Sequence, residues 1–316
     1  MKHFTSVNQI EDLDALILLA KQIKANPYAN KAIGENKTLG MLFFNSSLRT
    51  RLSTQKAAAN LGMNCIAMNL NTEGWSLEFE DGAIMDGNKA EHIKEAAQVI
   101  SQYCDVIAIR SFPSLTDKEK DEEDQVINSF VKYATVPVIS LEGATEHPLQ
   151  AIADILTIRE YQTKKRPKVV LTWAPHPKAL PHAVPNSFVK MMQLADVDFV
   201  ITHPKGYELN PEVTKNSLIN HDQNDAFKDA DFIYAKNWSN YNDYGQILSH
   251  DLSWTVTPEK MALTNEAKFM HCLPVRRNQI VSDAVLDSDT SIVIPQANNR
   301  TYAAQAILTK ILENEQ

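Results

Sequence analysis

The sequence has few glycines, no long apolar run and no excess of positive charge. Only nine of its 316 residues are glycine, and no Gly-x-Gly-x-x-Gly follows a predicted strand, which argues against a nucleotide-dependent oxidoreductase. No stretch approaches the roughly 18 apolar residues of a membrane helix, and the first residues lack the apolar segment of a signal peptide. The net charge of −8 argues against a nucleic-acid binder, which usually carries a basic surface. We therefore expect a cytoplasmic protein that binds neither membranes nor nucleic acid.

Cysteine is equally rare, and its placement shows no metal or disulfide pattern. Cys65, Cys104 and Cys272 form an odd count without paired spacing, as is typical of a reducing compartment. The nine histidines are scattered without ligand spacing, so we expect no metal. With 44% hydrophobic residues the chain can bury a large core, most naturally in two domains.

Short apolar runs alternate with helical patterns along the chain, which indicates βαβ units and parallel sheets. The predicted strands are 38–44, 64–68, 105–109, 137–141, 168–173, 198–202, 231–236, 268–273 and 291–295. The predicted helices are 8–26, 49–61, 90–103, 123–133, 148–161, 186–194, 211–219 and 303–312. Helix 148–161 begins with a proline, which favours a helix start, and is expected to connect two doubly wound α/β domains. The active site is expected at the carboxyl ends of the strands.

Residues 43–51, with the sequence FFNSSLRTR, carry the strongest chemical signal. A predicted buried strand ends there in small polar residues and runs into a helix, so backbone amides, hydroxyl groups and two guanidinium groups meet at a helix N-terminus. Such a place favours an anion, because the helix dipole and the amides attract it and arginine adds charge-assisted hydrogen bonds. A capped helix with surface arginines explains the same composition equally well, because serine and threonine are common caps.

This segment resembles the Ser-x-Arg-Thr-Arg phosphate motif of the aspartate and ornithine carbamoyltransferase family. Three further motifs of that family follow in order: Ile109-Arg110-Ser111, His147-Pro148-x-Gln150 and His271-Cys272-Leu273-Pro274. The resemblance implies a carbamoyl phosphate-binding domain over 1–147, an acceptor-binding domain over 148–300, and a C-terminal helix over 301–316 that packs back on the first domain. It also implies a knotted second domain, a homotrimer with shared sites, and a reaction without a cofactor.

The resemblance also assigns roles to the motif residues. The reaction needs donors that polarise the carbonyl of carbamoyl phosphate while an uncharged amine attacks it. The residues expected to take part in this step are Thr50, Arg110, His147 and Cys272. The residues expected to bind carbamoyl phosphate are Ser47, Leu48, Arg49, Thr50, Arg110, His147, Gln150 at the amide end, Cys272, Leu273, Arg300, and Trp75 from a neighbouring subunit. Without the resemblance, the histidine could merely cap a helix and the cysteine could belong to the core.

The acceptor site departs from that of ornithine carbamoyltransferases. Those enzymes recognise an α-ammonium group through an aspartate in an Asp-x-x-x-Ser-Met-Gly loop, whereas this chain has Lys236 in the aspartate's place and no such loop. A lysine would repel an ammonium group but suits a substrate whose α-nitrogen is acylated and neutral. The chain is therefore more similar to the N-acylornithine branch of the family. The residues that match acylornithine contacts in that branch are Glu142, His176, Lys236 and Arg276.

Residue 90 distinguishes the acyl groups within this branch. Acetyl enzymes have glutamate there and succinyl enzymes have proline, whereas this chain has Ala90. Glutamate would repel a second carboxylate and crowd a longer acyl chain, so alanine favours N-succinylornithine, whose carbamoylation serves arginine biosynthesis. The candidate partners for the additional carboxylate are His176, Lys178, Lys236 and Arg276.

Two alternatives are open at this point. N-acetylornithine could be the acceptor, because Ala90 matches neither pattern within the branch. A non-catalytic relative with the same fold would be expected to have lost part of the carbonyl-polarising set, but that set is complete in Arg49, Thr50, Arg110, His147 and Gln150. Ile280 stands where some acetyl enzymes carry a modified lysine, so no such modification is expected.

Overall fold

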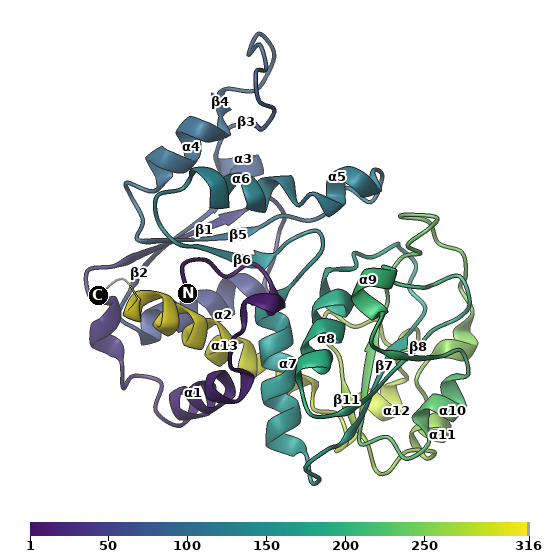
Figure 1. The fold of residues 1–316 in the computed structure, drawn as a ribbon. Coiled ribbons are helices and arrows are strands. Elements are labelled where there is room, and N and C mark those ends of the chain that lie inside the picture. The colour runs from purple at the N-terminus through teal and green to yellow at the C-terminus, as the bar shows by residue number, and fades with distance from the viewer. Residues whose placement is uncertain (315–316) are drawn as a thin grey trace. The chain divides into compact units, whose positions relative to one another are not determined.

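The computed structural model describes residues 1–314 of the chain, which forms two units, each with its own parallel sheet (Figure 1). Unit 1 comprises Met1–Ser114, Glu119–Leu149 and the chain from Arg300 onward, and unit 2 comprises Leu115–Lys118 and Gln150–Asn299. The chain passes from unit 1 into unit 2 within helix α7 (Pro148–Tyr161) and returns within helix α13 (Val293–Glu313). Within residues 1–314, no helix combines the length and the apolar character needed to cross a bilayer.

Unit 1 contains a four-stranded parallel sheet in the order β2-β1-β5-β6. The strands are β1 (Thr38–Phe43), β2 (Asn64–Asn69), β5 (Val106–Arg110) and β6 (Val138–Glu142). One face of the sheet carries α4 (Ile93–Ile100) and α6 (Gln125–Tyr133), and the other carries α2 (Arg49–Asn60) and the second half of α13, with α1 (Leu13–Ala25) on the same side (Figure 1). Because both faces are covered, β1, β5 and β6 are buried and their sequences are almost continuously apolar.

The core of unit 1 explains which helical residues face the sheet. Ile93 and Ala97 of α4 and Phe130 of α6 pack against Ile107 and Val138 of the strands, and all five side chains are buried. The remaining short elements before α7 are η1 (Val7–Gln9), η2 (Lys31–Gly34), α3 (Leu70–Glu73), β3 (Leu77–Glu78), β4 (Glu91–His92) and α5 (Lys118–Glu122). Strands β3 and β4 form a small parallel pair of their own.

Unit 2 contains a five-stranded parallel sheet in the order β11-β10-β7-β8-β9. The strands are β7 (Lys168–Trp173), β8 (Asp198–Thr202), β9 (Leu218–Asn220), β10 (Phe232–Lys236) and β11 (Lys268–Met270). The helices are α8 (Ala183–Leu194), α9 (Pro211–Thr214), α10 (Gln223–Phe227), α11 (Pro258–Met261), α12 (Asp283–Leu286) and the short η3 (Leu252–Trp254). Phe227 of α10 and Val285 of α12 pack on Val170, Ile233 and Phe269 of the sheet.

The strand order places a topological switch point in each sheet. In unit 1 the chain moves to one side from β1 to β2 and to the other side with β5 and β6, so the switch point lies between β1 and β5. In unit 2 it lies between β7 and β10. In open parallel sheets the loops that leave the carboxyl ends of such strands separate and form a crevice, where ligands bind. Each unit therefore offers one such position, and the predicted motif residues follow these strands.

The sequence prediction of an α/β fold with two parallel sheets is confirmed, but two predicted elements are wrong. Residues 291–295 are not a strand, because α13 begins at Val293 and only Ser291 forms an isolated bridge with Phe269. A short apolar run fits a strand and a buried helix start equally well, and Pro295 is tolerated in a first helical turn. The predicted helix 211–219 ends at Thr214, and Leu218–Asn220 forms edge strand β9 instead.

Candidate active site

The start of α2 in unit 1 has no polar side chain at its N-cap position. The N-cap is Leu48, whose own backbone is helical and whose side chain makes no capping hydrogen bond. The N-cap is therefore not one of the two serines before it. Thr50 is buried in the first turn, whereas Leu48 is largely exposed. Arg51 has a structural contact, because its Nη2 donates to the carbonyl of Ala67 at 3.2 Å.

Arg110 lies at the end of β5, directly beside the loop that leaves β1. Its Nη1 donates to the carbonyls of Asn45 at 3.1 Å and Ser46 at 2.7 Å, and its Nε donates to Glu142 Oε2 at 3.1 Å. These contacts use the N–H groups of Nε and Nη1 and leave those of Nη2 for a ligand. The side chain is only 6% exposed, and its guanidinium carbon lies 4.0 Å from the centroid of the Phe112 ring. Arg110 is therefore fixed in place before any substrate binds.

Three further predicted residues meet in the same part of unit 1. His147 Nε2 lies 3.7 Å from Glu142 Oε2 and 3.4 Å from Arg300 Nη2. Arg300 Nη2 also donates to Thr50 Oγ1 at 2.6 Å, and all four side chains are buried. This cluster thus brings together strand ends, the start of α2, the residue before α7 and the middle of α13. A buried group of two arginines, a histidine and a hydroxyl can bind an anion and polarise a carbonyl oxygen.

Two carboxylates that the sequence analysis did not single out hold the loop between β6 and His147. Asp124 accepts hydrogen bonds from the amides of Ala144 at 2.6 Å and Thr145 at 3.2 Å, and from the hydroxyl of Thr145 at 2.6 Å. Burial raises the pKa of the Asp124 carboxyl, although these three donors oppose the shift. Glu146 accepts from the hydroxyl of Ser6 at 2.7 Å. The loop that carries His147 is therefore anchored at both ends, and no sequence motif predicts these long-range contacts.

Trp75 and Ala90 lie apart from the cluster, on the segment around β3 and β4. The indole of Trp75 is 60% exposed, and its Nε1 donates to Glu91 Oε2 at 2.9 Å. The amide of Ala90 donates to the carbonyl of Ser76 at 3.0 Å, while its side chain is exposed. Within this chain, neither residue joins the predicted carbamoyl phosphate cluster of unit 1. A large exposed aromatic side chain held by a hydrogen bond is available for a contact with another molecule.

In unit 2, a buried network surrounds the predicted Gln150. Gln150 Nε2 donates to Asp154 Oδ1 at 2.8 Å, one helical turn further along α7. The same oxygen accepts from Gln296 Nε2 at 2.7 Å, and Gln296 Oε1 accepts from the amide of His271 at 2.9 Å. The network therefore connects the first turn of α7 to the His271-Cys272-Leu273 motif after β11. Asp154 is a functional candidate that the sequence analysis missed, and its spacing of four residues from Gln150 is the signal that could have indicated it.

Cys272 and Leu273 follow β11 beside this network. Cys272 is buried, and the amide of Leu273 donates to His271 Nδ1 at 2.8 Å. The peptide bond between Leu273 and Pro274 is cis. Burial of the Tyr234 hydroxyl raises its pKa well above the usual value, and Asp154 and Cys272 next to it add to the shift. Both cysteine and tyrosine are thus enclosed with the carboxylate rather than exposed to solvent.

The predicted acylornithine contacts of unit 2 form a cationic group. Arg276 Nε donates to His176 Nε2 at 3.1 Å, so Nδ1 of the neutral ring carries the proton and donates to the carbonyl of Lys178 at 2.8 Å. Burial lowers the pKa of His176, and the positive charges of Arg276, Lys236 and Lys178 lower it further. The neighbouring Arg277 differs, because it is ion-paired with two aspartates. Three cations around a neutral histidine form an environment suited to carboxylate groups.

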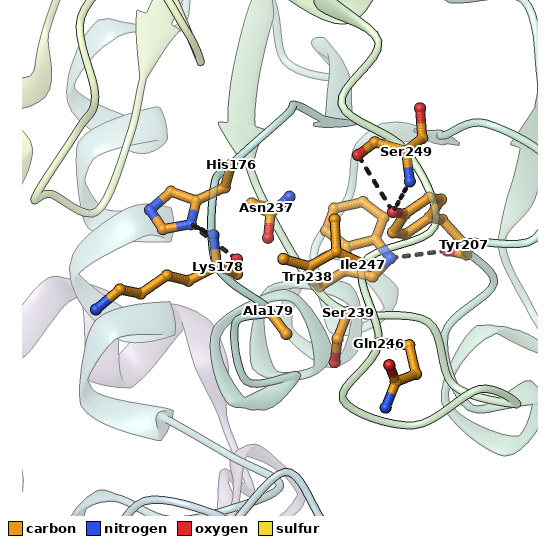
Figure 2. Close-up of a pocket in the computed structure, with 10 residues that line it drawn as sticks. All are labelled: His176, Lys178, Ala179, Tyr207, Asn237, Trp238, Ser239, Gln246, Ile247 and Ser249. Carbon is orange, nitrogen blue, oxygen red and sulfur yellow. Dashed lines mark hydrogen bonds between the residues drawn. The ribbon is translucent and has the colours of Figure 1, made fainter.

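A small pocket lies at the switch point of unit 2, next to these cations. Its wall is formed by residues after β7, β8 and β10 and by a later loop, namely His176, Lys178, Ala179, Tyr207, Asn237, Trp238, Ser239, Gln246, Ile247 and Ser249. Figure 2 shows the basic side chains on one side and Tyr207 with Ser249 on the other. The Tyr207 hydroxyl accepts from the amides of Leu248 and Ser249, both at 2.8 Å, and so fixes the loop over the pocket.

The stability of the protein should fall in mild acid because of His203, whose ring lies 6.2 Å from that of Trp238 in the pocket wall. Burial lowers the pKa of His203 below its ordinary value of 6.5. A histidine with a lowered folded pKa stabilises the fold above its unfolded pKa, and this contribution is lost as the pH falls towards the folded pKa. Between about pH 7.5 and 5.5 we expect unfolding free energy to drop, by at most about 1.4 kcal/mol per pH unit from this group.

Denaturant titrations over this pH range measure the effect. His203→Gln should flatten the pH dependence, whereas His250→Gln, at an exposed histidine, should leave it unchanged. Equal slopes for the wild type and His203→Gln would contradict the assignment.

Two family models match the chain. The model for the carbamoyl phosphate-binding domain of aspartate/ornithine carbamoyltransferases matches residues 2–160, and that for the aspartate/ornithine-binding domain matches residues 182–311. N-succinylornithine carbamoyltransferase from Bacteroides fragilis is 54% identical over 316 residues, covering 99% of each chain. N-acetylornithine carbamoyltransferase from Xanthomonas axonopodis pv. citri is 37% identical, covering 98% of this chain and 96% of the relative.

Solved structures show the same similarity. Acetylornithine transcarbamylase complexed with acetylcitrulline has a TM-score of 0.93 at 36% identity, covering 98% of this chain and 99% of the other. A variant of N-acetyl-L-ornithine transcarbamylase with one glutamate replaced by alanine, complexed with carbamyl phosphate and N-succinyl-L-norvaline, also has a TM-score of 0.93 at 36% identity. It covers 98% of this chain and 100% of that chain.

Proposed function

Because the chain belongs to the aspartate/ornithine carbamoyltransferase family, we propose that it transfers the carbamoyl group of carbamoyl phosphate to the δ-amine of N2-succinyl-L-ornithine. The products are N-succinyl-L-citrulline and phosphate, and the reaction serves arginine biosynthesis. Unit 1 binds carbamoyl phosphate and unit 2 binds the acylornithine. Carbamoyl transfer is the activity of the family, and our proposal concerns the identity of the acceptor.

In the proposed reaction, the phosphate dianion is bound by the amides and hydroxyls at the start of α2 together with Arg49. Arg110, His147 and Thr50 donate to the carbonyl oxygen, on which negative charge develops when the neutral amine attacks the carbon. The new C–N bond forms, the bond between the carbonyl carbon and the phosphate oxygen breaks, and the proton lost by the amine nitrogen leaves with the phosphate. Buried donors that are already in position stabilise this charge without reorganisation.

Glu142 is proposed to receive the δ-nitrogen of the acceptor. In an acylated ornithine this nitrogen is the only group that can carry a positive charge. The carboxylate is buried next to Arg110 and His147, so an amine attracted to it would lie beside the carbonyl that it attacks. This arrangement supports a role for Glu142 in placing the nucleophile and a role for Arg110 and His147 in polarising the electrophile.

The charge of unit 2 is the observation that carries the choice of acceptor. Lys178, Lys236 and Arg276 surround His176, so the group repels an α-ammonium and attracts carboxylates. N-succinylornithine has two carboxylates, whereas N-acetylornithine has one and ornithine adds an α-ammonium. Ala90 supports the same choice, because it lacks the charge and bulk of the glutamate expected in acetyl enzymes. The 54% identity to an N-succinylornithine carbamoyltransferase, and the crystallised glutamate-to-alanine variant with N-succinyl-L-norvaline, further support it.

The protein is further proposed to act as a homotrimer, in which Trp75 of one subunit enters the carbamoyl phosphate site of its neighbour. The exposure of Trp75 and its hydrogen bond to Glu91 support this role. The knotted path of the chain in the second domain stays a prediction. N-acetylornithine is the alternative acceptor, since Ala90 excludes neither substrate by itself.

A comparison of three acceptors tests the proposal. Purified protein is given carbamoyl phosphate with ornithine, N-acetylornithine or N-succinylornithine, and the ureido product is measured. We expect kcat/KM to be highest for the succinyl compound and lowest for ornithine. Faster turnover of N-acetylornithine would replace the proposed acceptor by the alternative, and no turnover of any acceptor would indicate a non-catalytic relative.

A further inference from the structure

We propose that Asp154 is a positioning residue that fixes the orientation of the Gln150 carboxamide and thereby makes the enzyme select carbamoyl phosphate over acetyl phosphate. The inference rests on the proposed function, in which Gln150 faces the nitrogen of the carbamoyl group. Asp154 itself touches no substrate in this proposal. It lies in the middle of α7 with 0% exposure, where an ionisable side chain is uncommon.

The hydrogen bonds around Asp154 determine the orientation of two amides. A carboxylate can only accept, so the NH₂ end of each glutamine must face Asp154 Oδ1. The distances are 2.8 Å for Gln150 and 2.7 Å for Gln296. The orientation of Gln296 is fixed a second time, because its Oε1 faces the amide of His271, which can only donate. The assignment of oxygen and nitrogen in both side chains therefore follows from chemistry rather than from shape.

The consequence for Gln150 is that its oxygen points away from the carboxylate. Gln150 is 1% exposed, and among the described residues its Oε1 has no hydrogen-bond partner. A buried acceptor without a partner favours a ligand that brings an N–H group. The carbamoyl group has an NH₂ group at the position where an acetyl group has a methyl group of similar size. An oriented Gln150 thus distinguishes two acyl phosphates that differ little in shape and share the same phosphate.

Without the carboxylate, this preference should disappear. If Asp154 is replaced by leucine, the Gln150 amide has no fixed acceptor and can present either end to the ligand. The quantity to measure is the ratio of the inhibition constant of acetyl phosphate, competing with carbamoyl phosphate, to the KM of carbamoyl phosphate. We expect this ratio to fall by about tenfold or more in Asp154→Leu, the effect of one hydrogen bond.

A double-mutant cycle shows whether Asp154 acts through Gln150. Gln150→Leu should lower the ratio as much as Asp154→Leu, and the double variant should lower it no further. Gln296→Leu is the matched control, because it disturbs the same carboxylate but leaves the contact between Gln150 and Asp154 intact. This variant should lose thermal stability and keep the ratio of the wild type. Asp154→Asn retains the shape and one carbonyl acceptor, so its ratio should lie between those of the wild type and Asp154→Leu.

Several results would overturn the inference. A lower Tm with an unchanged ratio in Asp154→Leu would show a purely structural role, and additive effects in the cycle would show that the two residues act independently. If Asp154→Leu does not fold, an unchanged ratio in Asp154→Asn gives the same negative answer. Failure of the proposed function is distinct, because the wild type itself would then not use carbamoyl phosphate.

Discussion

Replacing Arg110 by methionine should reduce kcat by about 10²- to 10³-fold, the usual effect of removing one donor from a developing oxyanion. Two N–H groups of its guanidinium are left for a ligand, while the others are bound to Glu142, Asn45 and Ser46. The donor is therefore oriented before substrate binds. Initial rates with carbamoyl phosphate and N-succinylornithine at saturation measure the change, and KM should rise much less than kcat falls.

Loss of stability has to be separated from loss of catalysis in this variant. Arg110→Met removes one partner of the buried Glu142, which also lies 3.7 Å from His147 Nε2, and loss of a buried ion pair costs up to about 3–5 kcal/mol. The double variant Arg110→Met/Glu142→Gln also removes the charge of the carboxylate that lost this partner, and it should regain stability but not activity. Arg51→Met is the matched control, since Arg51 lies in the same motif but bonds to the backbone of Ala67. An equal loss of kcat in the control, or recovery of kcat in the double variant, would contradict the role assigned to Arg110.

The parts of the site that could be predicted from the sequence are those in which the chemistry lies in consecutive residues. The chemistry of residues 43–51 can be predicted from these residues alone, because the end of a strand, a polar turn and a helix start follow one another there. His147 and Gln150 are similarly three residues apart across one helix start. Parallel sheets also follow from the alternation of strands and helices. The order of the strands within each sheet cannot be predicted in this way, although this order places the ends of β1 and β5 side by side.

The contacts that could not be predicted join residues far apart in the chain. Arg300 reaches Thr50 across 250 positions, and Gln296 reaches Asp154 across 142. Neither pair is visible in a periodicity, because each depends on where α13 returns to unit 1. The run at 291–295 shows the same limit at the level of secondary structure. Its apolar side chains suit either a strand or a helix, and the chain forms only an isolated bridge between Ser291 and Phe269 before α13 begins.

Replacing Ala90 by glutamate should shift the acceptor preference from N-succinylornithine towards N-acetylornithine by about ten- to a hundredfold in the ratio of kcat/KM values. A carboxylate at this position would repel the second carboxylate of the succinyl group and occupy space that its longer chain needs. The acetyl group is neutral and shorter, so its kcat/KM should change much less. The effect should also weaken as salt is added, since the side chain of residue 90 is exposed.

The control for this experiment is available in the same loop. Ala83 is also an exposed alanine, and Ala83→Glu adds the same charge a few residues away. If general repulsion by the loop determined the preference, both variants would shift it equally, whereas a contact at residue 90 predicts a shift in Ala90→Glu alone. An unchanged ratio in both would move the selection of the acyl group to Lys178, Lys236 and Arg276. In that case Lys236→Met should lower the succinyl preference, because the second carboxylate would lose an attractive partner rather than gain a repulsive one.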